Sequence, residues 1–144
     1  LVGEKADFVF IDGLHEFRQV IRDIINAGKN AKDDAVILIH DVLPVDQKSA
    51  LAKAKTRFWS GNVYKAIAFI KEKMPFLIID LINAYPTGLA VITGCNNRKF
   101  DTLDLDTLEE SLKDFEKLTR PNFKSNSKLF FLQTTMFRLS MFRL

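Results

Sequence analysis

Two apolar runs that end abruptly in acidic or imidazole side chains constrain the fold of this chain more than any other feature. Residues 8–11 and 35–39 are apolar. Asp12 directly follows the first run and His15 comes three positions later, whereas His40 and Asp41 directly follow the second run. A parallel strand that is covered on both faces has this appearance in sequence. Because open α/β sheets bind ligands beyond the carboxyl ends of their strands, these four residues are candidate site residues.

The segment between the two runs has the pattern of an amphipathic helix. Over residues 15–29 the apolar side chains recur at helical spacing and form one stripe: Phe17, Val20, Ile21, Ile24 and Ile25. A strand over 6–12, this helix and a strand over 35–40 make a strand–helix–strand unit, which predicts two neighbouring parallel strands.

The rest of the chain extends this α/β pattern. A long polar connection over 42–60 precedes a helix predicted over 63–74, with Asn62 as its cap. Strands are predicted over 76–82 and 89–93. The turn between them is too short for anything but an antiparallel pair. A last helix is predicted over 104–118.

The composition of the chain and the length of its apolar runs restrict the class of protein. The chain has 144 residues, of which 47% are hydrophobic, enough for one domain with its own core. Cys95 is the sole cysteine, so no internal disulfide can form, and a reducing compartment is indicated. No apolar run reaches the roughly 18 residues of a membrane span, and the first residues lack a signal-peptide pattern. We expect a cytoplasmic protein without a transmembrane segment.

The basic residues are unevenly distributed. From residue 117 onward there are six Lys or Arg and no acid, whereas 15 basic and 18 acidic side chains precede that point. We expect residues 119–144 to form a basic, poorly ordered tail, with no specific nucleic-acid partner. The alternative, contact of this tail with nucleic acid or an anionic membrane, stays open.

The polar strand ends predict a cation site. Neighbouring parallel strands lie about 4.8 Å apart, so Asp12 and Asp41 would converge within reach of one shared cation. Mg²⁺ prefers carboxylates and water, whereas His40 would favour a softer divalent ion. His15 opens the helix and would serve as a neutral base or ligand. The structural alternatives are that the two aspartates only form turns and that His15 is a surface residue.

The end of the long connection is a weaker candidate. Trp59 and Asn62, which lie around the start of the helix over 63–74, could form a wall of a substrate site, or could simply staple the helix start. No glycine spacing matches a dinucleotide or phosphate-binding loop. The chain also lacks zinc-type Cys/His spacing and a G-x-S-x-G motif.

The order of these motifs resembles the C-terminal half of a bacterial class I S-adenosylmethionine-dependent methyltransferase. The likeness rests on DFVFIDGLH at 7–15, AVILIHD at 35–41 and WSGNVYK at 59–65, and it extends over about residues 5–94. The family has a seven-stranded sheet whose last strand is antiparallel. The resemblance implies a partial Rossmann-like sheet made of strands four to seven with flanking helices, contained in residues 1–118.

The resemblance also implies roles for the polar residues. Metal-dependent O-methyltransferases of the catechol type hold Mg²⁺ with an Asp after the fourth strand and two adjacent polar residues after the fifth. Asp12, His40 and Asp41 occupy these positions, although His40 stands where those enzymes carry an acid. His15 would be the general base for the acceptor hydroxyl.

The cofactor-binding half of such an enzyme has no counterpart in this sequence. In the family, a glycine-rich loop and a later acid bind S-adenosylmethionine, and both would lie upstream of Leu1. We therefore expect a truncated methyltransferase, inactive alone, whose complete form methylates a hydroxyl of a sugar or small metabolite. The alternatives are a metal-dependent hydrolase or hydroxylase on the same sheet and a non-catalytic remnant, and a homo-oligomer stays open.

Overall fold

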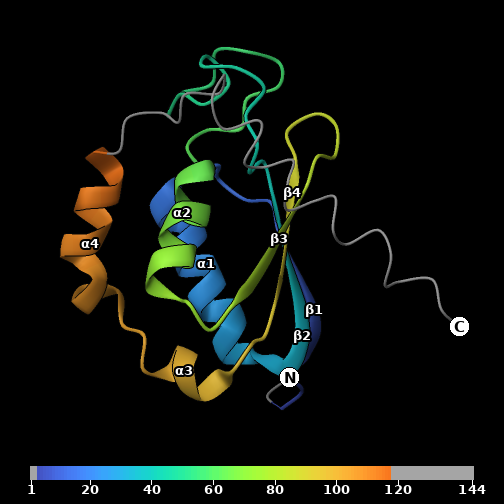
Figure 1. The fold of residues 1–144 in the computed structure, drawn as a ribbon, viewed down its shortest axis with the longest axis vertical. Coiled ribbons are helices and arrows are strands. Elements are labelled where there is room, and N and C mark those ends of the chain that lie inside the picture. The colour runs from blue at the N-terminus through green and yellow to red at the C-terminus, as the bar shows by residue number, and fades with distance from the viewer. Residues whose placement is uncertain (1–2, 118–144) are drawn as a thin grey trace, which may run out of the picture.

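A mixed sheet with helices packed on one side forms the core of the molecule (Figure 1). The computed structural model describes residues 3–117, so the predicted tail over 119–144 lies outside the described residues. The elements are, in chain order, β1 (Ala6–Ile11), α1 (Phe17–Asn30), β2 (Ala31–His40), α2 (Tyr64–Lys73), β3 (Ile78–Ile82), β4 (Leu89–Thr93), α3 (Asn97–Asp101) and α4 (Leu105–Lys117).

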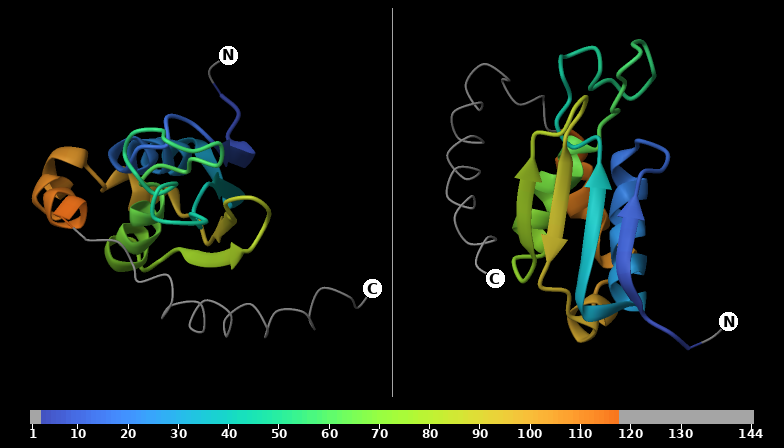
Figure 2. Two further views of the ribbon diagram at one scale, coloured as in Figure 1. Left: turned by 90° about the horizontal axis from the view of Figure 1, so that it is seen from above. Right: turned by 90° about the vertical axis from the view of Figure 1, so that its right-hand side faces the viewer.

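The strand order is β1-β2-β4-β3, and it confirms the predicted α/β class and partial Rossmann-like sheet. β1 and β2 are parallel, and β4 is antiparallel to both β2 and β3. β3 therefore runs in the same direction as β1 and β2. The right-hand view of Figure 2 shows the consequence: three strands end at one rim, where the long connection and the β3–β4 turn also lie.

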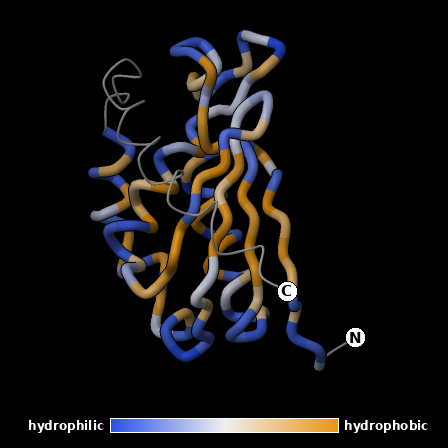
Figure 3. The backbone as a smooth tube through the Cα atoms, turned by 45° about the vertical axis from the view of Figure 1, so that its right-hand side comes forward, coloured by the Kyte–Doolittle hydropathy of each residue, from blue (hydrophilic) through white to orange (hydrophobic). Residues whose placement is uncertain are grey.

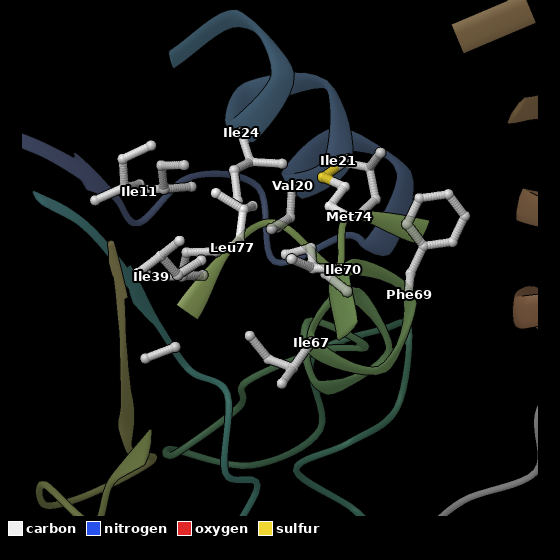
Figure 4. Packing of buried hydrophobic residues seen from close by; sticks show 14 of the residues in the cluster. Ile11, Val20, Ile21, Ile24, Ile39, Ile67, Phe69, Ile70, Met74 and Leu77 are labelled. Atoms are coloured by element: carbon white, nitrogen blue, oxygen red, sulfur yellow. The ribbon is translucent and has the colours of Figure 1, made fainter. Parts of the chain in front are cut away.

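The predicted apolar stripe of α1 fills the centre of the molecule. All five of its residues are buried, and Phe17, Ile21 and Ile24 are completely inaccessible. Figure 4 shows Ile21 beside Met74, which follows α2, and Ile24 near Leu77, which precedes β3. α4 forms an outer layer over α1 and α2 (Figure 1). Burial of this stripe holds α1 against one face of the sheet, over β1 and β2.

One short helix was not predicted. α3 has only five residues, too few for a hydrophobic period, although the Asn96 side chain caps it by accepting a hydrogen bond from the Lys99 N–H. Its buried Phe100 packs onto Gly28 of α1, where an added Cβ would lie 2.3 Å from the Phe100 ring. Gly28 lies inside α1, where its lack of a side chain makes room for that ring.

The second face of the sheet carries no helix among residues 3–117. Register places alternate side chains of all four strands on this open face, among them the exposed Phe8, Phe10, Ile78 and Ile82. Figure 3 shows the strands as hydrophobic stretches, with hydrophilic segments gathered in the loops at both ends of the sheet. The expectation that both faces of the strands are covered is thus wrong for the described residues.

No helix among residues 3–117 combines the length and apolar character needed to cross a membrane.

A phenylalanine-to-alanine substitution should reduce stability more on the helix-covered side of the sheet than on its open face. Phe17→Ala should lower the free energy of unfolding by about 3–5 kcal/mol, because it leaves a cavity in the core. Phe8→Ala, at a side chain that is 57% exposed, should change it by only about 0.5 kcal/mol. Urea unfolding of both variants measures the difference, and similar losses would contradict the assignment of the core to the helix-covered face.

An arginine clamp predicts a pH dependence of stability. Arg18 of α1 hydrogen-bonds to Glu109 and Glu116 of α4, and these bonds lower the pKa of both carboxyl groups. A carboxyl group with a lowered pKa in the folded state stabilises the protein above its ordinary pKa, and that contribution is lost as the pH falls. The unfolding free energy should therefore fall more steeply between about pH 5 and 3 in the unmodified protein than in Arg18→Met. Arg22→Met, on the same helix, is the control, and parallel pH profiles for all three proteins would contradict the clamp.

Candidate metal centre

The four predicted polar residues meet at the rim where β1 and β2 end. Asp12 directly follows β1, His40 is the last residue of β2 and Asp41 follows it. His15 lies in the short loop between β1 and α1. The parallel pairing of Ile11 with Ile39 brings these two strand ends to the same level of the sheet.

Asp12, His15 and Asp41 converge in a geometry that could hold a metal ion. One ligand atom from each lies within 4.8 Å of the others. His15 Nε2 is 3.1 Å from Asp41 Oδ2 and 3.6 Å from Asp12 Oδ1. His40 lies beside this triad, with Nδ1 3.1 Å from Asp12 Oδ1 and 3.5 Å from Asp41 Oδ2. The structure thus brings all four residues together, and the two imidazoles lie at similar distances from the same two carboxylate oxygens.

Asp41 is the most constrained of the four. It is only 4% exposed, and its Oδ1 accepts a hydrogen bond from the buried Thr87 hydroxyl. Its backbone N–H donates to the Gly88 carbonyl at 3.1 Å. One carboxylate oxygen is thereby held by the β3–β4 turn while Oδ2 faces His15. Sequence analysis missed Thr87 because its contact with Asp41 spans 46 positions, and a threonine in a turn gives no sign of such a contact.

Backbone strain is confined to the same cluster. His15 has φ 49° and Asp41 has φ 64°, and no other non-glycine residue between 3 and 117 has a positive φ. A left-handed conformation at a non-glycine residue costs on the order of 1–3 kcal/mol, so it persists only where surrounding contacts enforce it. Two such residues that face each other indicate a functional site.

The protonated nitrogen of the His15 ring is fixed by a backbone contact. His15 Nδ1 lies 3.1 Å from the Trp59 carbonyl oxygen, which can only accept a hydrogen bond. Nδ1 therefore carries a proton, and Nε2 of the neutral ring presents a lone pair to the two aspartates. The Trp59 indole stacks on this ring at 5.0 Å with an interplanar angle of 24°. Trp59 thus orients His15.

Asn62 serves the β1–α1 loop rather than the helix that follows it. Its backbone N–H donates to the His15 carbonyl at 3.2 Å, and its Oδ1 accepts from the Phe17 N–H at 2.6 Å. The prediction that Asn62 caps the helix over 63–74 is wrong, because α2 begins after Val63 without a side-chain cap. The folded loop instead places the Asn62 amide against the start of α1. The substrate contacts predicted for Trp59 and Asn62 stay predictions.

The loops around the cluster also expose apolar side chains. Leu14, beside His15, is 71% exposed, and Tyr85 in the β3–β4 turn is 84% exposed. Tyr85 packs edge-on against Phe58 of the long connection, with ring centroids 5.6 Å apart. Apolar and aromatic side chains are therefore exposed on the loops at this end of the sheet.

Comparison with known proteins supports a methyltransferase. Residues 1–42 match the sequence model of a family described as a methyltransferase domain. The matched segment contains β1, α1 and β2, together with all four polar residues of the cluster. No curated protein and no solved structure matches the chain.

The contact between Gly61 and the His15 backbone predicts that alanine destabilises the protein much more at Gly61 than at Gly13. In Gly61→Ala the new Cβ would lie 1.9 Å from the His15 carbonyl oxygen, at a φ of +61°. We expect a loss of about 1–3 kcal/mol in unfolding free energy. Gly13→Ala is the control, because the nearest atom to its Cβ would be 3.8 Å away, and it should be within about 0.5 kcal/mol of the unmodified protein. Equal stability of the two variants in thermal unfolding would contradict the close approach of the loop.

Proposed function

We propose that this chain is the acceptor-binding part of an S-adenosylmethionine-dependent methyltransferase that methylates a hydroxyl oxygen of a sugar or another small metabolite. The observation that carries this proposal is the methyltransferase match to the segment whose polar strand ends converge on one rim. Residues 1–118 would form the C-terminal part of the methyltransferase domain.

The donor set is suited to a divalent cation. Asp12, His15 and Asp41 would hold it, because their ligand atoms converge and because the buried Asp41 carboxylate has one oxygen turned toward the others. Such a cation, when bound, would orient and acidify the acceptor hydroxyl. Mg²⁺, which the resemblance implies, prefers a set made of oxygen atoms, so the presence of imidazole beside the two carboxylates departs from that expectation.

The chain's own residues would position the acceptor and accept its proton. The exposed Leu14 and Tyr85 offer apolar surface for the body of the acceptor, while the cluster receives its hydroxyl. S-Adenosylmethionine, when bound, would supply the methyl group, which would pass from its sulfur to the acceptor oxygen. With His15 holding the cation, the hydroxyl proton would pass to His40, the other imidazole of the cluster. Proximity and alignment of the two reactants would supply most of the rate.

Two features support a cofactor-binding half that is separate from residues 1–144. The described residues leave one face of the sheet apolar and open, and β1 is an edge strand with exposed Phe8 and Phe10. Long apolar edges are normally paired or covered. We propose that a further part of the same polypeptide covers this face and carries the loop that binds the cofactor. Residues 1–144 alone would then be inactive.

A second candidate is a metal-dependent hydrolase or hydroxylase. The mixture of imidazole and carboxylate in the cluster favours it, because such ligand sets also occur in those enzymes. It differs from the first proposal in needing no S-adenosylmethionine. A non-catalytic remnant, in contrast, would have no affinity for cations.

Calorimetric titration with S-adenosylmethionine tests the proposal. The complete polypeptide encoded by the gene of this chain should bind the cofactor and methylate a member of a hydroxyl-substrate panel, whereas residues 1–144 alone should show no binding. In the complete polypeptide, Asp41→Asn should lower methyl transfer by about 10–100-fold. Asp7→Asn, at the opposite end of β1, should leave it unchanged. Absence of cofactor binding by the complete polypeptide would reject the methyltransferase proposal.

A further inference from the structure

We infer that His15 binds the cation directly through Nε2, with the Trp59 carbonyl holding its other ring nitrogen, and that the site therefore selects a transition-metal ion such as Mn²⁺ over Mg²⁺. This inference deepens the proposed function and rests on it for the presence of a cation. It exchanges the roles expected for the two histidines, because the resemblance implied His40 as the ligand and His15 as the base.

The hydrogen bond to Trp59 gives His15 the arrangement of a metal ligand. Histidines that bind metals almost always donate their second ring N–H to a backbone carbonyl or a carboxylate, which fixes the tautomer and orients the ring. His15 Nδ1 does so at 3.1 Å, and the stacked Trp59 indole restricts rotation of the ring. The free nitrogen, Nε2, then points to Asp12 and Asp41.

The atoms around Nε2 favour a positive charge between them. In the neutral ring Nε2 is an acceptor, and it lies 3.1 Å and 3.6 Å from two carboxylate oxygens that are acceptors as well. Three lone pairs at such distances repel one another unless a cation or a proton lies among them. Asp41 cannot turn away, because Thr87 holds its other oxygen and the residue is buried.

The backbone of the site supports the same assignment. His15 and Asp41 are the two strained residues, and contacts from different loops hold each of them: Asn62 N–H on the His15 carbonyl and Gly88 O on the Asp41 N–H. Strain of this kind is retained where a geometry must be preformed. His40 Nδ1 lies 3.1 and 3.5 Å from the same two carboxylate oxygens, so the two imidazoles differ in what orients them rather than in distance. The Trp59 carbonyl and indole hold the ring of His15, which leaves His40 as the imidazole for proton transfer.

Ligand chemistry then decides which ion binds. One imidazole nitrogen with two carboxylate oxygens suits Mn²⁺, Fe²⁺, Co²⁺ or Zn²⁺, whereas Mg²⁺ is held by oxygen atoms alone. We expect Mn²⁺ to bind the metal-free chain more tightly than Mg²⁺ in calorimetric titrations of residues 1–144. No detectable binding of any of these ions, or tighter binding of Mg²⁺, would overturn the inference.

Pulsed electron paramagnetic resonance of the Mn²⁺ complex identifies the ligand. A ¹⁴N modulation from a coordinated imidazole should be present in the unmodified chain and in His40→Gln, and absent in His15→Asn. His15→Asn should also weaken Mn²⁺ binding by at least about 10–100-fold. Asparagine tolerates the left-handed backbone of position 15, so this variant should fold, and circular dichroism verifies that it does.

Further outcomes separate this inference from the proposed function. A ¹⁴N signal that persists in His15→Asn but disappears in His40→Gln would overturn the inference and return the ligand role to His40. Asp7→Asn is the control carboxylate, and it should leave Mn²⁺ affinity unchanged. Nitrogen ligation by His15 in a complete polypeptide that binds no S-adenosylmethionine would reject the methyltransferase proposal while leaving the metal assignment in place. Binding of S-adenosylmethionine without binding of a metal would support the methyltransferase proposal and overturn the metal assignment.

Discussion

The parallel pairing of β1 with β2 is the constraint on which the rest of the site depends. It brings the ends of both strands to one rim, so that Asp12 and Asp41 come together although 28 residues separate them in sequence. The pairing itself depends on α1, whose apolar stripe is buried against the sheet and sets the path from one strand to the next. The same strand–helix–strand unit therefore provides both the hydrophobic core and the polar cluster.

The loops hold in place the polar residues that the strands bring together. The long connection over 42–63 contains no helix or strand, yet it folds back on the β1–α1 loop, where Trp59 and Asn62 hold His15. The β3–β4 turn does the same for Asp41 through Thr87. Each strained residue is therefore held by a segment far from it in sequence. Rigid positioning of this kind is what a preformed cation site requires.

The sequence was sufficient for the features that depend on local pattern. The stripe of α1 and the tight turn before β4 predicted the helix, the antiparallel hairpin and the rim where the polar residues gather. The sequence was not sufficient for contacts between distant segments, because a hydrogen bond such as Thr87 to Asp41 leaves no trace in spacing. For the same reason Asn62 was assigned to the nearer helix, and the apolar strands did not reveal that one face of the sheet lies open among residues 3–117.

The central claim is that Asp12, His15 and Asp41 form a cation site at the end of two parallel strands. Anomalous diffraction from crystals of the chain grown with Zn²⁺ tests it most directly. The account predicts one strong peak about 2.0–2.2 Å from His15 Nε2 and from an oxygen of each aspartate. Well-ordered aspartates without a peak between them, or carboxyl groups that lie on separate parts of the surface, would contradict it.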